Sequence, residues 1–259
     1  MKQKQLLPND LPLVDVHVHT GTLDSYSLPL SYLDHLCYQV QIRSFLCAPC
    51  SWEESLARLE RTDPDPVPSA IVEKIRYWLW LSPVRQRAIE ILNKEEPPSG
   101  YSGIKVHPYA DHFDVTGPLL RPVFDAAERW RMPVAFHTGN IGCSPSAIAK
   151  YLPSDFEQPI ILFHSRPLDE ALAAARSRPC ILLESSFTDP EDFARSFDVV
   201  GPERVLYGSD YPVGAVFLPG IDVVAQYRRN VEELLDVCER RGATRAFFSA
   251  NALRVFRGL

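Results

Sequence analysis

Short apolar segments alternate with longer helical segments eight times along this chain of 259 residues. Each apolar segment is rich in β-branched or aromatic residues, which favours a strand, and is followed by apolar residues at helical spacing. The expected strands are 14–20, 40–48, 76–81, 103–107, 133–137, 160–164, 180–184 and 204–207. This alternation strongly restricts the fold, because strands connected through helices form parallel sheets.

Eight strand–helix repeats with right-handed crossovers favour closure of the sheet into a (β/α)8 TIM barrel. The length agrees, since barrels of roughly 250 residues fold as one unit. Hydrophobic residues make up 46% of the chain, which is sufficient for a large core. We therefore expect a single barrel domain over residues 1–259. Two segments are expected to be loops: 21–27, rich in serine, aspartate and glycine, and the proline-rich 62–68.

Residues that can bind a metal recur at the C-terminal ends of the expected strands. His17 and His19 lie two residues apart on the first strand, so their imidazoles point to the same side. The further candidates at strand ends are Lys105, His137, His164 and Asp210. A single His-x-His pair could equally be two structural histidines, but the recurrence at one end of a barrel favours a metal centre.

Charge and cysteine usage narrow the classes of function. The net charge of −6 is spread without a basic block, so we expect neither nucleic acid nor an anionic membrane as a partner. No apolar run reaches the length of a transmembrane helix, and the interrupted start of the chain predicts no signal peptide. Six irregularly spaced cysteines favour reduced thiols, and the C-x-x-C at 47–50 is a weak zinc or redox motif. We expect a cytoplasmic protein with a small-molecule substrate, as a monomer or a homo-oligomer.

The combination of motifs resembles the amidohydrolase superfamily, in particular its amidohydrolase 2 branch of TIM-barrel metal-dependent hydrolases. The resemblance covers essentially the whole chain. The segments that carry it are 15–19 (Asp-Val-His-Val-His), 103–108, 133–139, 161–164, 205–212 (Val-Leu-Tyr-Gly-Ser-Asp-Tyr-Pro) and the closing 251–256 (Asn-Ala-Leu-Arg-Val-Phe). Each piece alone is common, whereas the combination is specific.

The resemblance implies a ligand set for one or two metals. For one metal, the ligands that it implies are His17, His19, His137 and Asp210. Members with two metals carry a carboxylated lysine at the position of Lys105 and bind the second ion through the histidine at the position of His164. In members with one metal, that histidine acts on the substrate or on water. We expect one Zn²⁺, with two ions or another divalent metal as the alternatives.

Nitrogen and oxygen ligands of this kind suit zinc, which can lower the pKa of a bound water from 15.7 to roughly 7. Asp210 is expected to take up the proton and return it to the leaving group. His164 could polarise a carbonyl oxygen or stabilise an oxyanion. A Lys105 that is not carboxylated could instead hold a substrate carboxylate. Together these residues predict a hydrolase that acts on a small amide, lactone or related carbonyl compound.

Further residues have two readings each. His107 shares its strand face with Lys105 and could line the substrate pocket, or it could only cap a strand that ends at Pro108. Arg166 could bind an anionic group or lie in solvent. Glu184 could orient a ligand histidine or lie at an exposed strand end, because buried lone carboxylates are unfavourable. Tyr211 is a candidate pocket wall.

Two alternative functions stay open at this point. The first is a metal-dependent non-oxidative decarboxylase of a small carboxylic acid, because the same branch includes such enzymes. The second is a non-catalytic metal-binding barrel, against which the intact ligand set argues. Substrate identity depends on loops whose conformation the sequence does not determine.

Overall fold

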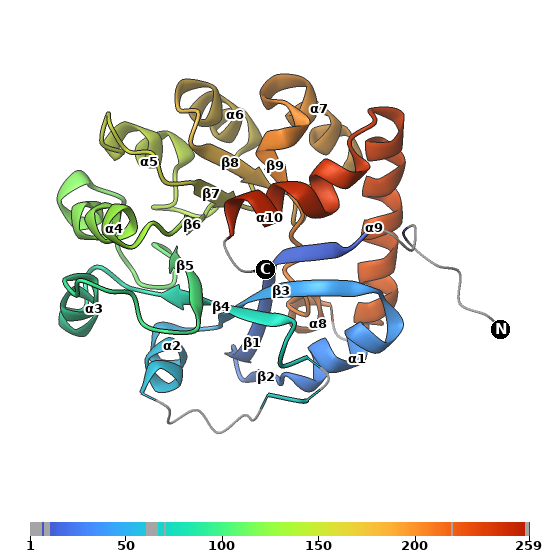
Figure 1. Ribbon diagram of the computed structural model, residues 1–259, viewed down its shortest axis with the longest axis horizontal. Helices are drawn as coiled ribbons and strands as arrows, with labels where there is room; N and C mark the ends of the chain where they lie inside the picture. Colours follow the sequence, from blue (N-terminus) through green and yellow to red (C-terminus); the bar gives the residue numbers. More distant parts are fainter. Residues whose placement is uncertain (1–6, 8–10, 61–66, 70, 219, 257–258) are drawn as a thin grey trace.

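The computed structural model describes residues 7, 11–60, 67–69, 71–218, 220–256 and 259. These residues form a curled sheet of nine strands in the order β2-β1-β3-β4-β5-β6-β7-β8-β9, with helices on its outer side (Figure 1). The parallel strands are β1 Leu13–Leu23, β3 Ile42–Pro49, β4 Ile75–Trp80, β5 Tyr101–Val106, β6 Val134–His137, β7 Ile160–Phe163, β8 Ile181–Glu184 and β9 Val205–Leu206.

The outer layer contains the connecting helices. They are α1 Ser31–Gln39, α2 Trp52–Leu59, α3 Gln86–Leu92, α4 Gly117–Trp130, α5 Pro145–Tyr151, α6 Leu168–Ser177, α7 Pro190–Val200, α8 Gly214–Phe217, α9 Val223–Arg240 and α10 Asn251–Val255. Most positions agree with the sequence pattern; α5, for example, starts after Ser144, whose side chain accepts a hydrogen bond from Ala147 N. The short α8 was not predicted.

Backbone hydrogen bonds between the first and last parallel strands close the barrel. Val16 N donates to Tyr207 O at 3.0 Å, and beyond the end of β9, Asp210 N donates to His17 O at 2.7 Å. His19 N in turn donates to Tyr211 O at 2.7 Å. The predicted (β/α)8 barrel is therefore confirmed, and its seam holds Asp210 directly beside the His-x-His strand.

The barrel interior is filled with apolar side chains. Val16, Trp78 and Phe163 are buried there, and the Trp78 indole donates to Val16 O at 2.9 Å. Helix α10 crosses the end opposite to the strand C-termini (Figure 1), where the Phe256 ring packs edge-on against Trp78 at 5.4 Å and the Asn251 amide donates to Val205 O. These contacts fill the centre of the barrel at this end, so the interior is accessible from the C-terminal ends of the strands.

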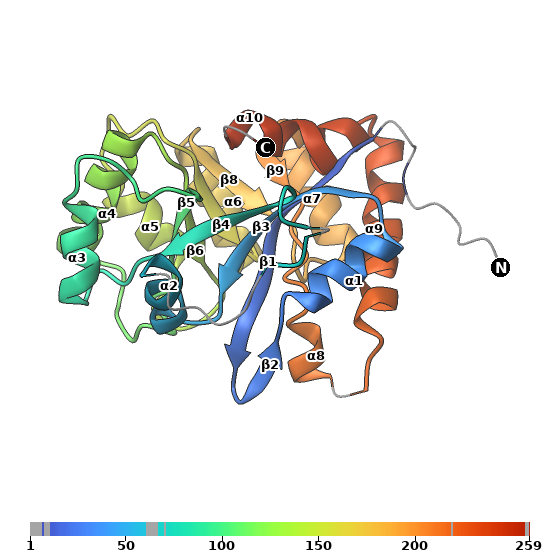
Figure 2. The same ribbon diagram turned by 60° about the horizontal axis from the view of Figure 1, so that its bottom comes forward.

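The expected loop at 21–27 is instead a hairpin, so that prediction was wrong. β1 continues to Leu23, turns at Asp24 and Ser25, and returns as the antiparallel β2 Tyr26–Leu28. Asp24 and Ser25 both have positive φ, as a two-residue type I′ turn requires, but the usual Asn-Gly signal is missing. The hairpin extends past the barrel beside α8 (Figure 2) and packs through Leu28 against Val216.

Glu54 fixes this hairpin to the turn after β3. Its carboxylate accepts Thr22 N at 2.6 Å and Cys50 N at 2.8 Å, directly above Gly21. Gly21 has φ +117°, and a Cβ there would lie 1.9 Å from Glu54 Oε2. The absence of a side chain at Gly21 is thus what allows the contact.

We expect Gly21→Ala to lower the free energy of unfolding more than Gly100→Ala, as measured by denaturant titration. Gly100 has a similar φ of +88° but open space around its Cβ position, so the control carries only the backbone strain. That strain costs about 1–2 kcal/mol. At Gly21 the new methyl group would also displace the Glu54 carboxylate, and the loss of its hydrogen bonds to Thr22 N and Cys50 N should add about 1–3 kcal/mol. Equal losses in the two variants would show that the Glu54 contact is unimportant.

Two expectations from the sequence concern membrane segments and residues outside the described ranges. None of the helices in the described part of the chain has the length and apolar character that crossing a bilayer would require. The expected loop at 62–68 falls largely on residues outside the described ranges, as does most of the chain start on which the signal-peptide argument depends.

Candidate functional site

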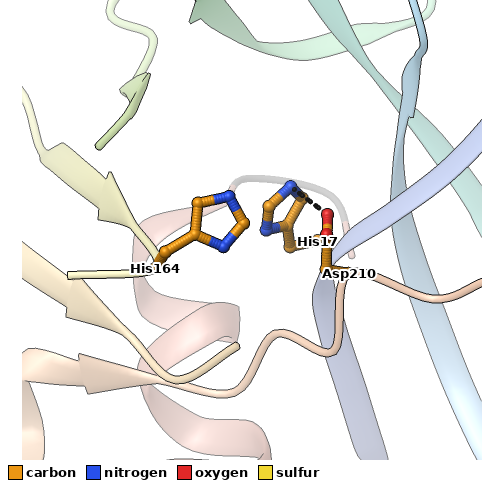
Figure 3. Close-up of side chains that lie close together, drawn as sticks. All are labelled: His17, His164 and Asp210. Atoms are coloured by element: carbon orange, nitrogen blue, oxygen red, sulfur yellow. Dashed lines mark ion pairs between the residues drawn. The ribbon is translucent and has the colours of Figure 1, made fainter. Parts of the chain in front are cut away.

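Three donor atoms converge beside His17 and His19, near the end of the part of β1 that pairs with β3. The Nε2 atoms of His17 and His19 lie 3.1 Å apart, and Asp210 Oδ1 lies 3.0 Å from the first and 3.2 Å from the second. All three side chains are buried. Strand alternation brings the two imidazoles to one face, and the seam hydrogen bond to His17 O places Asp210 opposite them. Figure 3 shows Asp210 in contact with His17, and His164 on the other side of the His17 ring.

This triangle of atoms fits a divalent metal. Tetrahedral zinc with bonds of about 2.0–2.1 Å places its ligand atoms about 3.3 Å apart, close to the observed spacing. The His17 ring presents Nδ1 to Glu184 at 3.3 Å, which leaves a lone pair on Nε2. Lone pairs and a carboxylate oxygen that face one another are favourable only around a cation or a shared proton. His17, His164 and Asp210 also form a group whose ligand atoms lie within 4.8 Å of one another.

A second pair of imidazoles lies beside this triangle. His164 Nε2 is 3.1 Å from His137 Nδ1, and His137 Nε2 is 2.7 Å from Asn140 Oδ1. The His137 ring stacks on His107 at 3.8 Å between centroids, and His107 stacks on Trp80 at 5.1 Å. His107 therefore lines the cavity and also accepts Ala110 N through its Nδ1 atom. The stack fixes the plane of the His137 ring.

Lys105 is buried between the two groups of histidines. Its Nζ atom lies 3.2 Å from His19 Nε2 and faces the rings of Trp80 and Phe163 at 5.1 and 5.3 Å. Burial lowers the pKa of this amine to about 8, although the charge of Asp210 acts in the opposite direction. A lysine in this environment can lose its proton readily.

Two buried carboxylates, those of Glu184 and Asp15, contact the histidines of the site or their backbone. Glu184 accepts His164 N at 2.9 Å and lies against His17, so the exposed position considered for it is wrong. Asp15 accepts the backbone N of His17 and of Ser209 at 3.1 Å, and the Ser209 hydroxyl at 2.6 Å. Burial raises the pKa of Asp15 to about 7 and raises that of Glu184 as well. Asp15 thus ties β1 to the residue before Asp210.

A cavity of about 720 Å³ lies over this site and is lined there by His19, Lys105, His137, His164 and Asp210. Its cationic side chains are Lys105 and Arg166, and the Arg166 guanidinium lies 5.4 Å from the Phe187 ring. Its aromatic walls include Trp80, Tyr109, Phe187 and Phe217. Tyr211 lies outside this cavity, because its hydroxyl is turned away and donates to Tyr32 O at 3.2 Å. The arrangement suits a small, flat and anionic ligand.

A family model described as amidohydrolase matches residues 76–258. The chain belongs to this amidohydrolase family. The resemblance that the sequence motifs indicated is thereby confirmed, and with it the expectation of an enzyme of this type. No curated protein sequence matches the chain.

Solved structures share the fold of this amidohydrolase. A probable 2-pyrone-4,6-dicarboxylic acid hydrolase from Acinetobacter baumannii, with citric acid bound, is 11% identical over 95% of this chain and 99% of its own, with a TM-score of 0.64. An amidohydrolase from Burkholderia multivorans with bound zinc is 16% identical over 94% and 98%, with a TM-score of 0.65. A 5-carboxyvanillate decarboxylase from Novosphingobium aromaticivorans, complexed with manganese, is 13% identical over 95% and 96%, with a TM-score of 0.58.

The electrostatics of the site keep its imidazoles neutral. Burial lowers the pKa of His17 and His164 well below the ordinary value, and it lowers that of His137 to about 4. Neutral imidazole is the form that binds a metal. Burial alone would raise the pKa of Asp210, but the hydrogen bond with His19 and the nearby charge of Lys105 help to lower it overall. The site therefore presents unprotonated ligands and an ionised carboxylate near neutral pH.

Proposed function

We propose that this amidohydrolase is a metal-dependent hydrolase of a small amide, lactone or related carbonyl compound. The observation that carries the proposal is the triangle of His17, His19 and Asp210 inside a barrel whose opposite end is covered by α10. These residues and His137 would hold the metal, which would supply a Lewis acid that polarises a carbonyl and activates water. Zinc suits these nitrogen and oxygen donors.

The other residues of the cavity have roles that follow from their charge. Asp210 takes up the proton of the attacking water and returns it to the leaving group. His164 faces the same space and acts on the substrate or on water. Lys105 and Arg166 bind an anionic group of the substrate, and His107 packs against it from the wall. Two of the similar structures are named for substrates that are small rings with carboxylate groups, 2-pyrone-4,6-dicarboxylic acid and 5-carboxyvanillate. These names support an anionic substrate.

A decarboxylase of a small carboxylic acid is the second candidate. A free Lys105 amine and Arg166 would hold the carboxylate that leaves, and the fold is shared with a decarboxylase complexed with manganese. Product analysis separates the two: hydrolysis adds water and retains every carbon, whereas decarboxylation releases carbon dioxide. Turnover should be measured on a panel of lactones, amides and aromatic carboxylates.

We expect the purified protein to contain about one equivalent of divalent metal per chain, because the triangle is a single set of three donors. His19→Ala should lose most of the bound metal. His35→Ala is the control and should lose none, because His35 is exposed in the middle of α1. The measurement is elemental analysis of protein prepared without chelators, before and after reconstitution with zinc. A protein that takes up no metal, or a His19→Ala variant that keeps it all, would contradict the proposal.

The same analysis tests the number of ions. We propose one zinc, because His164 and the Lys105 amine are the candidate ligands left for a second ion, and that amine lies 3.2 Å from His19 Nε2. Two equivalents, together with a mass increase that locates a carbamate on Lys105, would replace this with a two-metal centre. A cytoplasmic location is likewise proposed, and the irregular spacing of the six cysteines, which favours reduced thiols, supports it.

A further inference from the structure

Glu184, at the end of β8, receives hydrogen bonds on both carboxylate oxygens. Oε2 accepts His164 N at 2.9 Å and the Ser186 hydroxyl at 2.8 Å, and Oε1 accepts Ser186 N at 2.6 Å. Oε2 also faces His17 Nδ1 at 3.3 Å. Backbone N–H groups can only donate. The two that face Glu184, one on each oxygen, favour the carboxylate form against burial, which raises the pKa of Glu184 to about 8. As a carboxylate, Glu184 can only accept from His17 Nδ1. His17 therefore carries its ring proton on Nδ1.

Ser186 passes this constraint to a second histidine. A serine hydroxyl has one hydrogen, and that of Ser186 is directed to Glu184. Its Oγ atom can then only accept from His164 Nδ1, which lies 2.7 Å away. His164 thus carries its proton on Nδ1 as well, and its Nε2 atom presents a lone pair to the cavity.

The loop that carries Asp210 is shaped around the Glu184 carboxylate. A Cβ at Gly208 would lie 2.2 Å from Glu184 Oε1 and 2.8 Å from the Cβ of His17. Only a residue without a side chain allows β8, β1 and this loop to meet here. The carboxylate is therefore held in place from all three elements.

We propose that Glu184 and Ser186 are positioning residues that set the tautomers of His17 and His164 together, so that both Nε2 atoms enter the site without a proton. As a consequence, His164 accepts a hydrogen bond, from the attacking water or from an O–H or N–H of the substrate. The sequence analysis considered that His164 polarises a carbonyl oxygen, but in this tautomer its Nε2 atom cannot donate a hydrogen bond to one. The assignment deepens the proposed function and rests on it, because a cation in the site makes it favourable for the Nε2 lone pair of His164 to lie 3.1 Å from His137 Nδ1. The ring proton of His137 faces Asn140 Oδ1.

The tautomers can be read by ¹⁵N NMR of the full-length protein with ¹⁵N-labelled histidine, both as purified and after removal of metal. The Nδ1–H and Nε2–H forms have distinct pairs of ring nitrogen shifts, and His164→Asn identifies the signals of His164. We expect His164 in the Nδ1–H form in the native protein. Ser186→Ala should shift it towards Nε2–H, and Ser186→Thr, which keeps the hydroxyl, should restore the native shifts.

Ser185→Ala is the matched control. Ser185 is buried beside Ser186, but its hydroxyl donates to Gly208 O and contacts neither histidine. Its His164 shifts should match those of the native protein. Glu184→Gln should disturb both histidines and lower the affinity for zinc by about 10–100-fold, as is common for residues that orient a metal ligand. A native His164 in the Nε2–H form, or a Ser186→Ala variant with unchanged shifts, would overturn the assignment even if metal binding and turnover were confirmed.

Discussion

Asp210→Asn is expected to reduce kcat by more than about 10³-fold and to remove most of the bound metal, because one change eliminates a charged ligand and a proton acceptor. Asp210 Oδ1 lies within 3.2 Å of both Nε2 atoms of the His-x-His pair and supplies the negative charge of the triangle. An asparagine has the same shape but no charge, so the metal would be held by neutral groups. The two losses need not be additive, since both act through one atom.

The measurement is metal content and turnover of the same preparation, on the substrate that the panel identifies. Asp155→Asn is a suitable control, because it makes the same chemical change at an exposed position. Reconstitution of Asp210→Asn with excess zinc separates its role as a metal ligand from its role as a proton acceptor. If the variant regains the metal but not the turnover, the defect is in proton transfer. A variant that keeps its metal and more than a tenth of its activity would show that Asp210 has neither role.

Strand periodicity was enough to predict the part of the site that lies on regular structure. His17 and His19 share a face because side chains alternate along β1, and His137, His164 and Lys105 were located because each lies at or near the end of an apolar run. The prediction required only that parallel strands end at one edge of a barrel. The structure brings these residues together at that edge.

Periodicity could not predict the contacts that depend on turns between strands. Ser186 and Asn140 follow their strands, and whether each contacts a histidine is decided by a loop conformation. Tyr211 illustrates the same limit, since its hydroxyl reaches Tyr32 instead of the cavity. Asp15 is different, because a carboxylate in the middle of an apolar strand is costly unless it is paired. The sequence therefore signalled that Asp15 has buried hydrogen-bond partners, and the structure identifies Ser209 as one of them.

His164→Asn is expected to lower kcat by about 10²–10⁴-fold, the range for the loss of a group that acts on a proton in the transition state. Most of the metal should stay, because the His17, His19 and Asp210 triangle is complete without His164. Asparagine can still accept a hydrogen bond through its oxygen, but its shorter side chain does not reach the position of Nε2.

Metal content and kcat of His164→Asn should be compared with those of His112→Asn, an exposed residue at the rim of the same cavity. The rim variant should retain its metal and most of its kcat, with any change confined to KM. If His164→Asn lost half or more of its metal while Asp210→Asn stayed active, the roles proposed for the two residues would be wrong. A two-metal centre with His164 as a ligand would then account better for the 3.1 Å approach of His164 to His137.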